Sequence, residues 1–350
     1  MKGTTTNTRF DPATAARIRL TVSCRDSDPI PKVNGAGQVV DGVQLMHNGV
    51  KVIPGCYYGD WMTEVIRGLR GHHEPQEEAA FHAIVEQLRR SSARPVMIEC
   101  AAFWAYYSLW LLQAVPTASV VLVEPDPHNL AVGQENFRLN GRTGTWVNAA
   151  IGGAYAAAVP FRCESDLVQR VMPQESLSSL LARLGLDHVD ILHVDAQGAE
   201  VAFIQNGRDI LAEGRIRFCV ISTHHHSIGG DPLAHERCVE LFSELGAHLI
   251  AEHTVAESYS GDGLICASFD PRDKDLVVPI SRARSREGIF GDPLADLARC
   301  QDLLADTGQQ LAQTSLLLEE ESRRRAASEA SLAGAVRRRV RKAWAELSNR

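Results

Sequence analysis

The sequence has no uninterrupted apolar run that approaches the roughly 20 residues needed to cross a bilayer. Residues 1–6 also lack the apolar segment of a secretory signal. Paired cysteines are missing too, because the eight cysteines stand singly and none forms the Cys-x-x-Cys pair of a zinc knuckle or redox couple. We therefore expect a cytoplasmic protein with reduced, mostly buried thiols.

Acidic residues outnumber basic ones outside the C-terminal tail. Residues 323–350 hold nine Arg or Lys against only Glu329 and Glu346, a charge of +7, so the formal net charge of −7 leaves −14 for the residues before them. Proteins that bind nucleic acid depend on basic contacts to phosphates. The acidic body therefore predicts that nucleic acid is not a partner.

The length of 350 residues, 45% of them hydrophobic, is enough for one large domain with extensions. We expect an N-terminal extension on the substrate side (1–70), a main domain (71–275), and a linker followed by a helical, basic-ended tail (276–350). The first forty residues show little periodicity, apart from a short apolar alternation at 18–22. This lack of periodicity predicts a loose lead-in.

Short apolar runs alternate with amphipathic helices from about residue 95, which is typical of a mainly parallel sheet covered on both faces. The pattern predicts a doubly wound α/β fold with seven strands, the last two forming a hairpin. Strands are expected at 95–99, 120–124, 145–150, 189–195, 218–223, 248–253 and 264–269, and helices at 106–114, 127–139, 177–184, 200–206 and 232–245.

The tail carries two helical patterns. Leu297, Leu304, Leu311 and Leu318 lie seven residues apart, but the second edge of a coiled-coil seam is poor, so a weak coiled coil and a helix docked on the body fit equally well. Further on, one apolar face lies opposite a basic face. Such a helix suits either the inner face of a membrane or a solvated, partner-binding role. The oligomeric state is not indicated.

Acidic residues end three of the expected strands. Glu99 precedes a small-residue loop and a helix, Glu124 ends the next strand, and Asp195 ends the fourth. The carboxyl ends of such strands form the ligand-binding edge of a doubly wound sheet. Carboxylates gathered there repel one another, and a cationic ligand would relieve that repulsion.

These segments resemble the FkbM family of S-adenosylmethionine (SAM)-dependent methyltransferases from about Gly71 to Phe269. The family's loop Ile-Asp-Val-Gly-Ala-Asn-x-Gly-Tyr-Tyr-Ser aligns without gaps onto residues 98–108, its Glu-Pro onto 124–125, and its Asp-Val-Glu-Gly-Ala-Glu onto 195–200. Its Tyr-Glu-Pro turn resembles residues 73–75, and its following Asn resembles Asn136 or Asn140. The resemblance implies a Rossmann-like class I methyltransferase fold with SAM as cofactor.

The resemblance also implies roles for individual residues. Glu99 and the backbone around Ala101 would hold the methionine end of SAM, Glu124 would hold the ribose, and residues 148–151 would flank the adenine. Asp195 would face the methyl group and the acceptor. The cofactor-binding set that we expect is Glu74, Glu99, Ala101, Phe103, Ser108, Glu124, Pro125, Asn148, Ala150 and Asp195.

The loop departs from the family pattern. Ala101 and Ala105 replace its two glycines, and a side chain where φ is positive can cost on the order of 1 kcal/mol. We expect Ala105 to be the milder change, because alanine is favourable at the start of a helix. Phe103 stands where the family has Asn, and Gln197 replaces a carboxylate.

Methyl transfer to a hydroxyl requires a base that removes its proton. The expected catalytic residues are Asp195, His193, His224 and His226, since alternation along an extended backbone places His224 and His226 on one face. The histidines could instead be polar loop residues that contact only substrate or water. A divalent metal held by two of them with Asp195 is a further alternative that we do not expect, and no metal site is assigned.

The leading hypothesis is SAM-dependent O-methylation of a hydroxyl on a sugar, glycan or secondary metabolite, with N-methylation of an amino sugar also open. The alternative is a catalytically weak or inactive SAM-fold protein that serves as a binding module or scaffold in a biosynthetic complex. A nicotinamide dehydrogenase shares the strand-loop-helix layout, but it leaves residues 195–198 and the final hairpin unexplained.

Overall fold

The computed structural model describes residues 10–284, 290 and 293–348. The chain forms two compact units, Met1–Asp292 and Pro293–Arg350. The start of the expected lead-in (1–9) and the end of the expected tail (349–350) lie outside the described residues.

The first unit is built on a seven-stranded sheet with the order β12-β13-β11-β10-β4-β5-β6. All neighbouring strands pair in parallel except β13, which runs antiparallel between β11 and β12. The predicted seven strands and final hairpin are confirmed. The strands are β4 (Val96–Cys100), β5 (Ser119–Val123), β6 (Thr145–Val147), β10 (Val189–Val194), β11 (Ile216–Thr223), β12 (His248–His253) and β13 (Gly263–Ser268).

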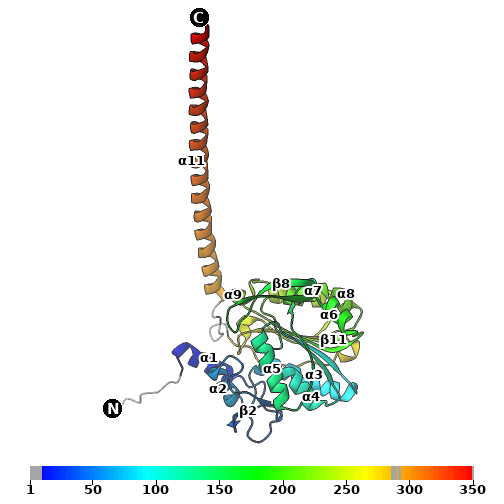
Figure 1. Cartoon of the computed structure of the whole chain (residues 1–350). Coiled ribbons are helices and arrows are strands. Elements are labelled where there is room, and N and C mark those ends of the chain that lie inside the picture. The colour runs from blue at the N-terminus through cyan, green and yellow to red at the C-terminus, as the bar shows by residue number, and fades with distance from the viewer. Residues whose placement is uncertain (1–9, 285–289, 291–292, 349–350) are drawn as a thin grey trace, which may run out of the picture. The chain divides into compact units, whose positions relative to one another are not determined.

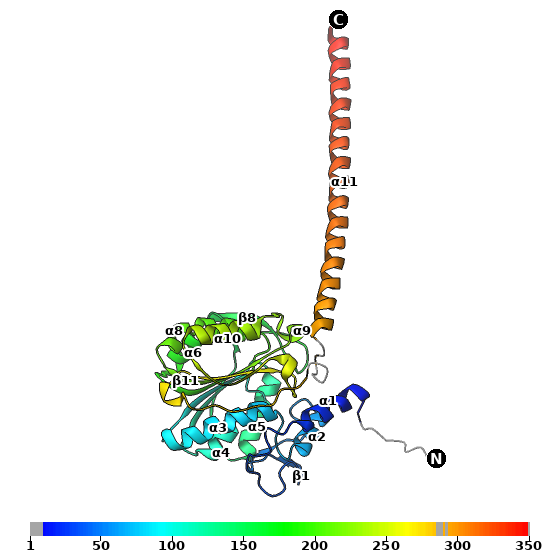
Figure 2. The same cartoon turned by 180° about the vertical axis from the view of Figure 1, so that it is seen from behind.

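Helices cover both faces of this sheet, so the fold is doubly wound as predicted (Figures 1 and 2). Every residue of β10, β11 and β13 is buried, as expected for strands covered on both sides. One face carries α3 (Pro75–Ser91), α4 (Tyr106–Ala114) and α5 (Pro127–Leu139), and the other carries α6 (Leu177–Leu184), α7 (Glu200–Asn206), α8 (Arg208–Ala212) and α10 (Ala234–Glu244).

The N-terminal segment begins with a helix, where the sequence predicted a loose lead-in. Helix α1 (Pro12–Ser23) contains the 18–22 alternation, so the expectation of a loose lead-in was wrong for these residues. Its start has a physical cause: Asp11 accepts hydrogen bonds from the backbone N–H groups of Ala13 and Thr14, and Pro12 occupies the first helical position. A small sheet and a second helix follow, β1 (Val39–Val40), β2 (Val43–Leu45), β3 (Lys51–Val52) and α2 (Asp60–Gly68).

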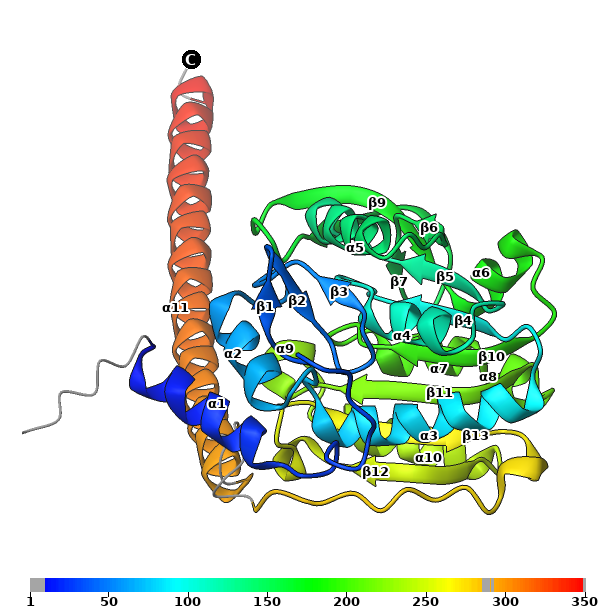
Figure 3. The ribbon, with the colours of Figure 1, turned by 90° about the horizontal axis from the view of Figure 1, so that it is seen from below.

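This N-terminal segment packs against α3 and α4 (Figure 3). Met46, Val50 and Val65 belong to the same buried cluster as Phe81 of α3 and Trp110 of α4. The segment predicted as an extension therefore shares one hydrophobic core with the segment that follows it.

A third sheet interrupts the predicted alternation. The strand expected at 145–150 divides into β6 and β7 (Ala150–Ile151), and β7 pairs with β9 (Gln169–Glu175) instead of the central sheet. β9 pairs in turn with β8 (Ala156–Arg162). Periodicity did not predict this antiparallel pair, because its residues are mostly exposed or half-buried and give no regular apolar alternation.

The second unit is one long helix, α11 (Pro293–Ser348). No helix in the described part of the chain combines the length and the apolar character needed to span a membrane.

Candidate functional site

The carboxyl ends of β4, β5 and β10 open onto one cavity of about 420 Å³. Glu99, Glu124 and Asp195 all line it, so the acids predicted on three strand ends do meet. The remaining walls come from the 101–104 loop, from β8, and from Tyr57 and Tyr58 of the N-terminal segment. The volume lies in the range of sites that hold a small molecule.

The loop after β4 has an unusual backbone. Ala101, Phe103 and Ala105 have φ values of 54°, 41° and 62°, in the left-handed region that favours glycine. Ala105 is the residue that precedes α4 and does not lie within its first turn, so the expectation that it is the milder departure was wrong. Non-glycine residues held in this region store on the order of 1–3 kcal/mol of strain each.

Glu99 is buried at the base of the cavity. Its Oε2 accepts a hydrogen bond of 2.9 Å from the backbone N–H of Ser108. Burial raises the pKa of the Glu99 carboxyl, and His193 opposes that shift only in part. Ser108 itself lies inside α4 and does not line the cavity, so its contribution is to orient Glu99 through its backbone.

Glu124 is held by the loop it faces. Its Oε2 accepts from the backbone N–H of Phe103 at 2.9 Å and its Oε1 from that of Asp126 at 2.8 Å. Burial raises the pKa of this carboxyl to about 8. Asn148 lies behind it and donates to the backbone carbonyls of Glu124 and Pro125, so it shapes the turn and does not line the cavity.

His193 on β10 lines the cavity with a carboxylate behind it. Its Nε2 lies 2.8 Å from Oε1 of Glu77, and Oε2 of Glu77 accepts from Ser222 at 2.8 Å. Burial lowers the pKa of His193, but the hydrogen bond and charge of Glu77 outweigh it and leave the pKa raised. Among the described residues, His193 Nδ1 has no hydrogen-bond partner. Glu77 therefore fixes the proton on Nε2 and leaves Nδ1 as an acceptor.

The sequence reasoning missed Glu77. No local pattern in the sequence indicates that Glu77, in the first turn of α3, has a partner that lies 116 residues away. Glu74 at the start of the same helix was predicted and does line the cavity. Burial and the neighbouring acids Glu77 and Asp195 raise the pKa of Glu74, which accepts from the Tyr107 hydroxyl at 3.2 Å.

Asp195 lies two residues beyond His193 and forms a second pair. Its Oδ1 is 2.9 Å from Nε2 of His224, whose Nδ1 is 3.0 Å from Glu200. Burial lowers the pKa of His224, but the carboxylates of Asp262, Asp195 and Glu200 raise it well above its usual value. Burial raises the pKa of Asp195, and the hydrogen bond from His224 more than reverses that, so Asp195 is ionised. His224 lies behind Asp195 and outside the cavity lining.

His226 does not share a face with His224, so that prediction was wrong. The extended backbone of β11 ends at Thr223, and His226 is the first residue of the short helix α9 (His226–Gly229). Alternation applies only while the chain remains extended. His226 packs beside His225, away from the cavity lining.

Nine of the predicted site residues line the cavity and four do not. The four are Ser108, Asn148, His224 and His226, and the first three each contact a residue that does line it. The nine are Glu74, Glu99, Ala101, Phe103, Glu124, Pro125, Ala150, His193 and Asp195.

The cavity mouth joins two distant segments. Gln197, after β10, donates to the hydroxyl of Tyr58 in the N-terminal segment at 3.0 Å. Both residues have a φ of 51°. Tyr57 packs edge-on against Phe103 with ring centroids 5.3 Å apart, so aromatic rings cover the loop from outside. The N-terminal segment thus supplies one wall of the site.

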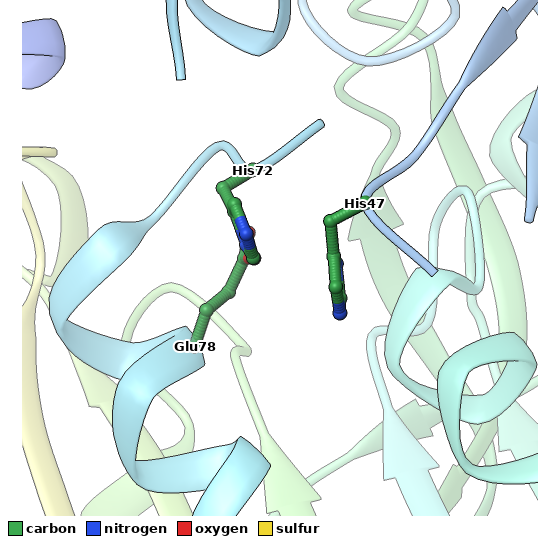
Figure 4. A group of neighbouring side chains, drawn as sticks. All are labelled: His47, His72 and Glu78. Atoms are coloured by element: carbon green, nitrogen blue, oxygen red, sulfur yellow. The ribbon is translucent and has the colours of Figure 1, made fainter. Parts of the chain in front are cut away.

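A buried cluster of His47, His72 and Glu78 lies behind this wall (Figure 4), with ligand-type atoms within 4.8 Å of one another. The two imidazoles are stacked, with centroids 4.2 Å apart and planes inclined by 16°. Because nitrogen lone pairs lie in the ring planes, two rings stacked in this way cannot both point at one ion. Glu78 instead hydrogen-bonds His72 and the backbone N–H of His73, which fixes the turn that begins α3 and so positions Glu74 and Glu77.

Comparison with known proteins identifies this segment. The family model described as Methyltransferase FkbM domain matches residues 93–249, which include the strand ends and the loop of the site. No curated protein matches the chain at a significant level.

Similar solved structures include a precorrin-6y C5,15-methyltransferase from Geobacter metallireducens GS-15, with 15% identity over 53% of this chain and 86% of that one and a TM-score of 0.34. The N-terminal domain of human METTL16 has 12% identity over 77% and 98%, with a TM-score of 0.38. Cofactor-bound Rv0187 from MTB has 15% identity over 75% and 92%, with a TM-score of 0.37. Likenesses this weak carry no conclusion about the chain. The family match confirms the resemblance noted in the sequence, and the chain carries a methyltransferase domain of the FkbM family at residues 93–249.

Proposed function

We propose that the protein is a SAM-dependent O-methyltransferase that acts on a hydroxyl of a sugar, glycan or secondary metabolite. The observation that carries this proposal is the His193–Glu77 pair: His193 lines a cavity that also holds Glu99, Glu124 and Asp195, Glu77 binds its Nε2, and its buried Nδ1 has no hydrogen-bond partner among the described residues. A hydroxyl needs such a base, because its own pKa is far above neutrality.

The donor set of the cavity fits SAM. SAM carries an ammonium and a sulfonium, and the cavity presents Glu99, Glu124 and Asp195, with Arg162 as its one lysine or arginine among the described lining residues. Burial holds the pKa of Glu124 near 8, and a cation or a ribose diol beside it would compensate the ionised form. Glu99 would hold the methionine end, Glu124 the ribose, and the segment around Ala150 would lie along the adenine.

When bound, SAM supplies a methyl carbon already activated by its sulfonium. The chain's residues then have to orient the acceptor and take its proton. Nδ1 of His193 would accept the proton that the acceptor hydroxyl gives up, and Glu77 would stabilise the resulting imidazolium. Asp195 is kept ionised by His224 and accepts a hydrogen bond from the acceptor, which fixes its orientation.

Calorimetric titration of the full chain with SAM and S-adenosylhomocysteine tests the cofactor assignment. Binding of both is expected, and binding of neither up to millimolar concentration would exclude the enzyme. Transfer of labelled methyl from SAM to a panel of hydroxylated and amino sugars, glycans and polyketide alcohols then tests the reaction class. Asp195→Ala should lose turnover on the acceptor so found while it keeps SAM binding, and unchanged turnover would overturn the role of Asp195.

One observation favours the second candidate, a SAM-fold binding or scaffold protein without turnover. Ala101 and Ala105 have positive φ values, where glycine is favoured, and they lie in the loop that would have to approach the cofactor closely. The same calorimetry separates the two proposals, since a scaffold that has lost the cofactor site would bind neither ligand. SAM binding without transfer to any member of the panel would favour the scaffold.

A further inference from the structure

Helix α11 presents a long surface that the rest of the described chain does not explain. It has 56 residues and therefore a length of about 84 Å. Its described side chains are exposed almost throughout. Exposed leucines and valines over such a length are unusual for a helix surrounded only by water.

Six exposed apolar residues of α11 fall on one side of the helix, in a leucine group and a valine group that Arg325 and Glu329 separate. At ~100° per residue, the seven-residue leucine repeat drifts by only about 60° from its first to its last member, and the valines farther on return to the same face. Each of these side chains is more than half exposed. They are Leu297, Leu304, Leu311, Leu318, Val336 and Val340.

Charge divides the helix into two opposite halves around Ser322. Residues 296–321 carry six acidic side chains and one basic side chain, Arg299, for a net charge of −5. Residues 323–348 carry eight basic and two acidic side chains, for a net charge of +6. The division is sharpest at the centre, where three glutamates (319–321) are followed after Ser322 by three arginines (323–325).

This arrangement is complementary to itself in one orientation only. Two copies that pair antiparallel about a two-fold axis at Ser322 place the glutamates of each copy level with the arginines of the other, and the leucine stripe of each faces the valine stripe of the other. Parallel pairing would instead set glutamates beside glutamates. A two-fold axis makes every such contact occur twice.

We propose that α11 is a self-association surface whose partner is α11 of a second copy of this chain, paired antiparallel. The apolar stripe supplies the buried seam, and the charged halves set the orientation, as flanking charges do in coiled coils. The proposal goes beyond the methyltransferase activity and does not depend on it. An anionic membrane fits the helix less well, because the leucine half of the apolar face belongs to the acidic segment.

The first experiment measures the oligomeric state of the full chain by sedimentation equilibrium. A dimer that dissociates on dilution is expected. A monomer at all concentrations would overturn the proposal, as would a monomer that binds vesicles of phosphatidylglycerol through α11. Circular dichroism of each variant below checks that the helix is retained.

Charge reversal then tests the orientation. The triple change Arg323→Glu, Arg324→Glu and Arg325→Glu should raise the dimer dissociation constant about 10–100-fold, since like charges now meet at the centre. When Glu319–Glu321 are also changed to Arg, so that the two triplets are exchanged, the dimer dissociation constant should return to within about twofold of the wild-type value. Loss of the dimer in the exchanged variant as well would contradict pairing through these charges.

Crosslinking gives an independent readout of direction. Leu304 and Val340 lie equally far from Ser322, so antiparallel copies bring them level. In a Cys300→Ser background, chains carrying Leu304→Cys should form disulfides with chains carrying Val340→Cys, and neither variant alone should crosslink. Crosslinking of each variant with itself, and not with the other, would show parallel pairing and overturn the proposal.

Discussion

The two halves of the cavity are held in place by different means. On the β4–β5 side, Glu99 and Glu124 accept hydrogen bonds from backbone N–H groups, and the loop between them contains three residues with positive φ. On the β10–β11 side, His193 and Asp195 are held by other side chains, Glu77 and His224. The site residues of the first half are therefore held by the conformation of the backbone. Those of the second half are held by hydrogen bonds between ionisable side chains.

This difference separates two properties that substitutions usually change together. Backbone changes in the first half should alter cofactor affinity and stability, and leave the acceptor's proton transfer intact. Side-chain changes in the second half should alter turnover and its pH dependence, and leave cofactor affinity intact. The predictions below test that separation.

His193→Gln is expected to have the largest effect. Loss of a general base should lower turnover about 10²–10³-fold on the acceptor that the panel identifies, while the Kd for SAM stays within about twofold. His188→Gln is the matched control, because His188 precedes the same strand with a side chain that is 52% exposed. If His193→Gln also lost SAM binding, cofactor affinity and turnover would not be controlled separately by the two sides of the cavity.

The pH dependence of turnover should come from the same half. Because Glu77 raises the pKa of His193, the base form grows as pH rises through that pKa, and turnover should rise with it. The rising limb should be missing in His193→Gln and shifted to lower pH in Glu77→Gln, whose His193 has lost the charge that raises its pKa. Rate profiles across pH at saturating SAM measure this. If the wild type and both variants showed the same rising limb, a group other than His193 would be responsible for it.

Glu124→Ala should weaken SAM binding about 10–100-fold, because a hydrogen-bonding carboxyl group is removed from the position proposed for the ribose. Turnover at saturating SAM should change far less. Glu135→Ala on α5, whose side chain is 41% exposed, serves as the control. Calorimetry gives the Kd values. An unchanged Kd for SAM in Glu124→Ala would show that Glu124 does not contribute to cofactor binding.

Glu124 should also make stability depend on pH in the absence of ligand. Burial raises its pKa from 4.5 to about 8, so its contribution is fully present below the lower value and is lost as pH rises through the higher one. Glu124→Gln should therefore lose less stability than the wild type as pH rises from about 4.5 to about 8, a difference of a few kcal/mol at most. Urea unfolding at several pH values measures it, and parallel curves for the two proteins would contradict the shift.

Ala101→Gly and Ala105→Gly are expected to have the smallest effects and the opposite sign. Each should raise the free energy of unfolding by about 0.5–1 kcal/mol, since relief of positive-φ strain outweighs the added chain entropy of glycine. SAM affinity should tighten by a few-fold at most. Ala83→Gly, inside α3 where φ is helical, should instead destabilise by about 1 kcal/mol. Destabilisation at all three positions would show that the loop is not strained.

Much of this could be read from the sequence, and the failures have physical causes. The strands near Glu99, Glu124 and Asp195 were predictable because buried parallel strands are continuous apolar runs, and in this sequence an acid follows or closes each of the three runs. Glu77 was not, because its partner His193 is distant in the sequence. His226 was misplaced because the end of β11 depends on tertiary packing and the sequence around it gives no break.

The wall formed by Tyr57 and Tyr58 could not have been predicted from local pattern either. Its position depends on the contacts of the whole N-terminal segment. The αL conformation of Ala105 was missed for a simpler reason, since alanine is a strong helix former and its propensity argued for the helix start.

The shared core of the N-terminal segment limits how this enzyme can be rebuilt. Met46, Val50 and Val65 pack into the cluster that holds α3 and α4, and the same segment supplies Tyr57 and Tyr58 to the cavity. A graft of residues 93–249 into another scaffold would carry the strand ends and leave behind α3 with Glu74 and Glu77, together with the aromatic wall. Transfer of the activity to another scaffold therefore requires a segment that begins before Met46.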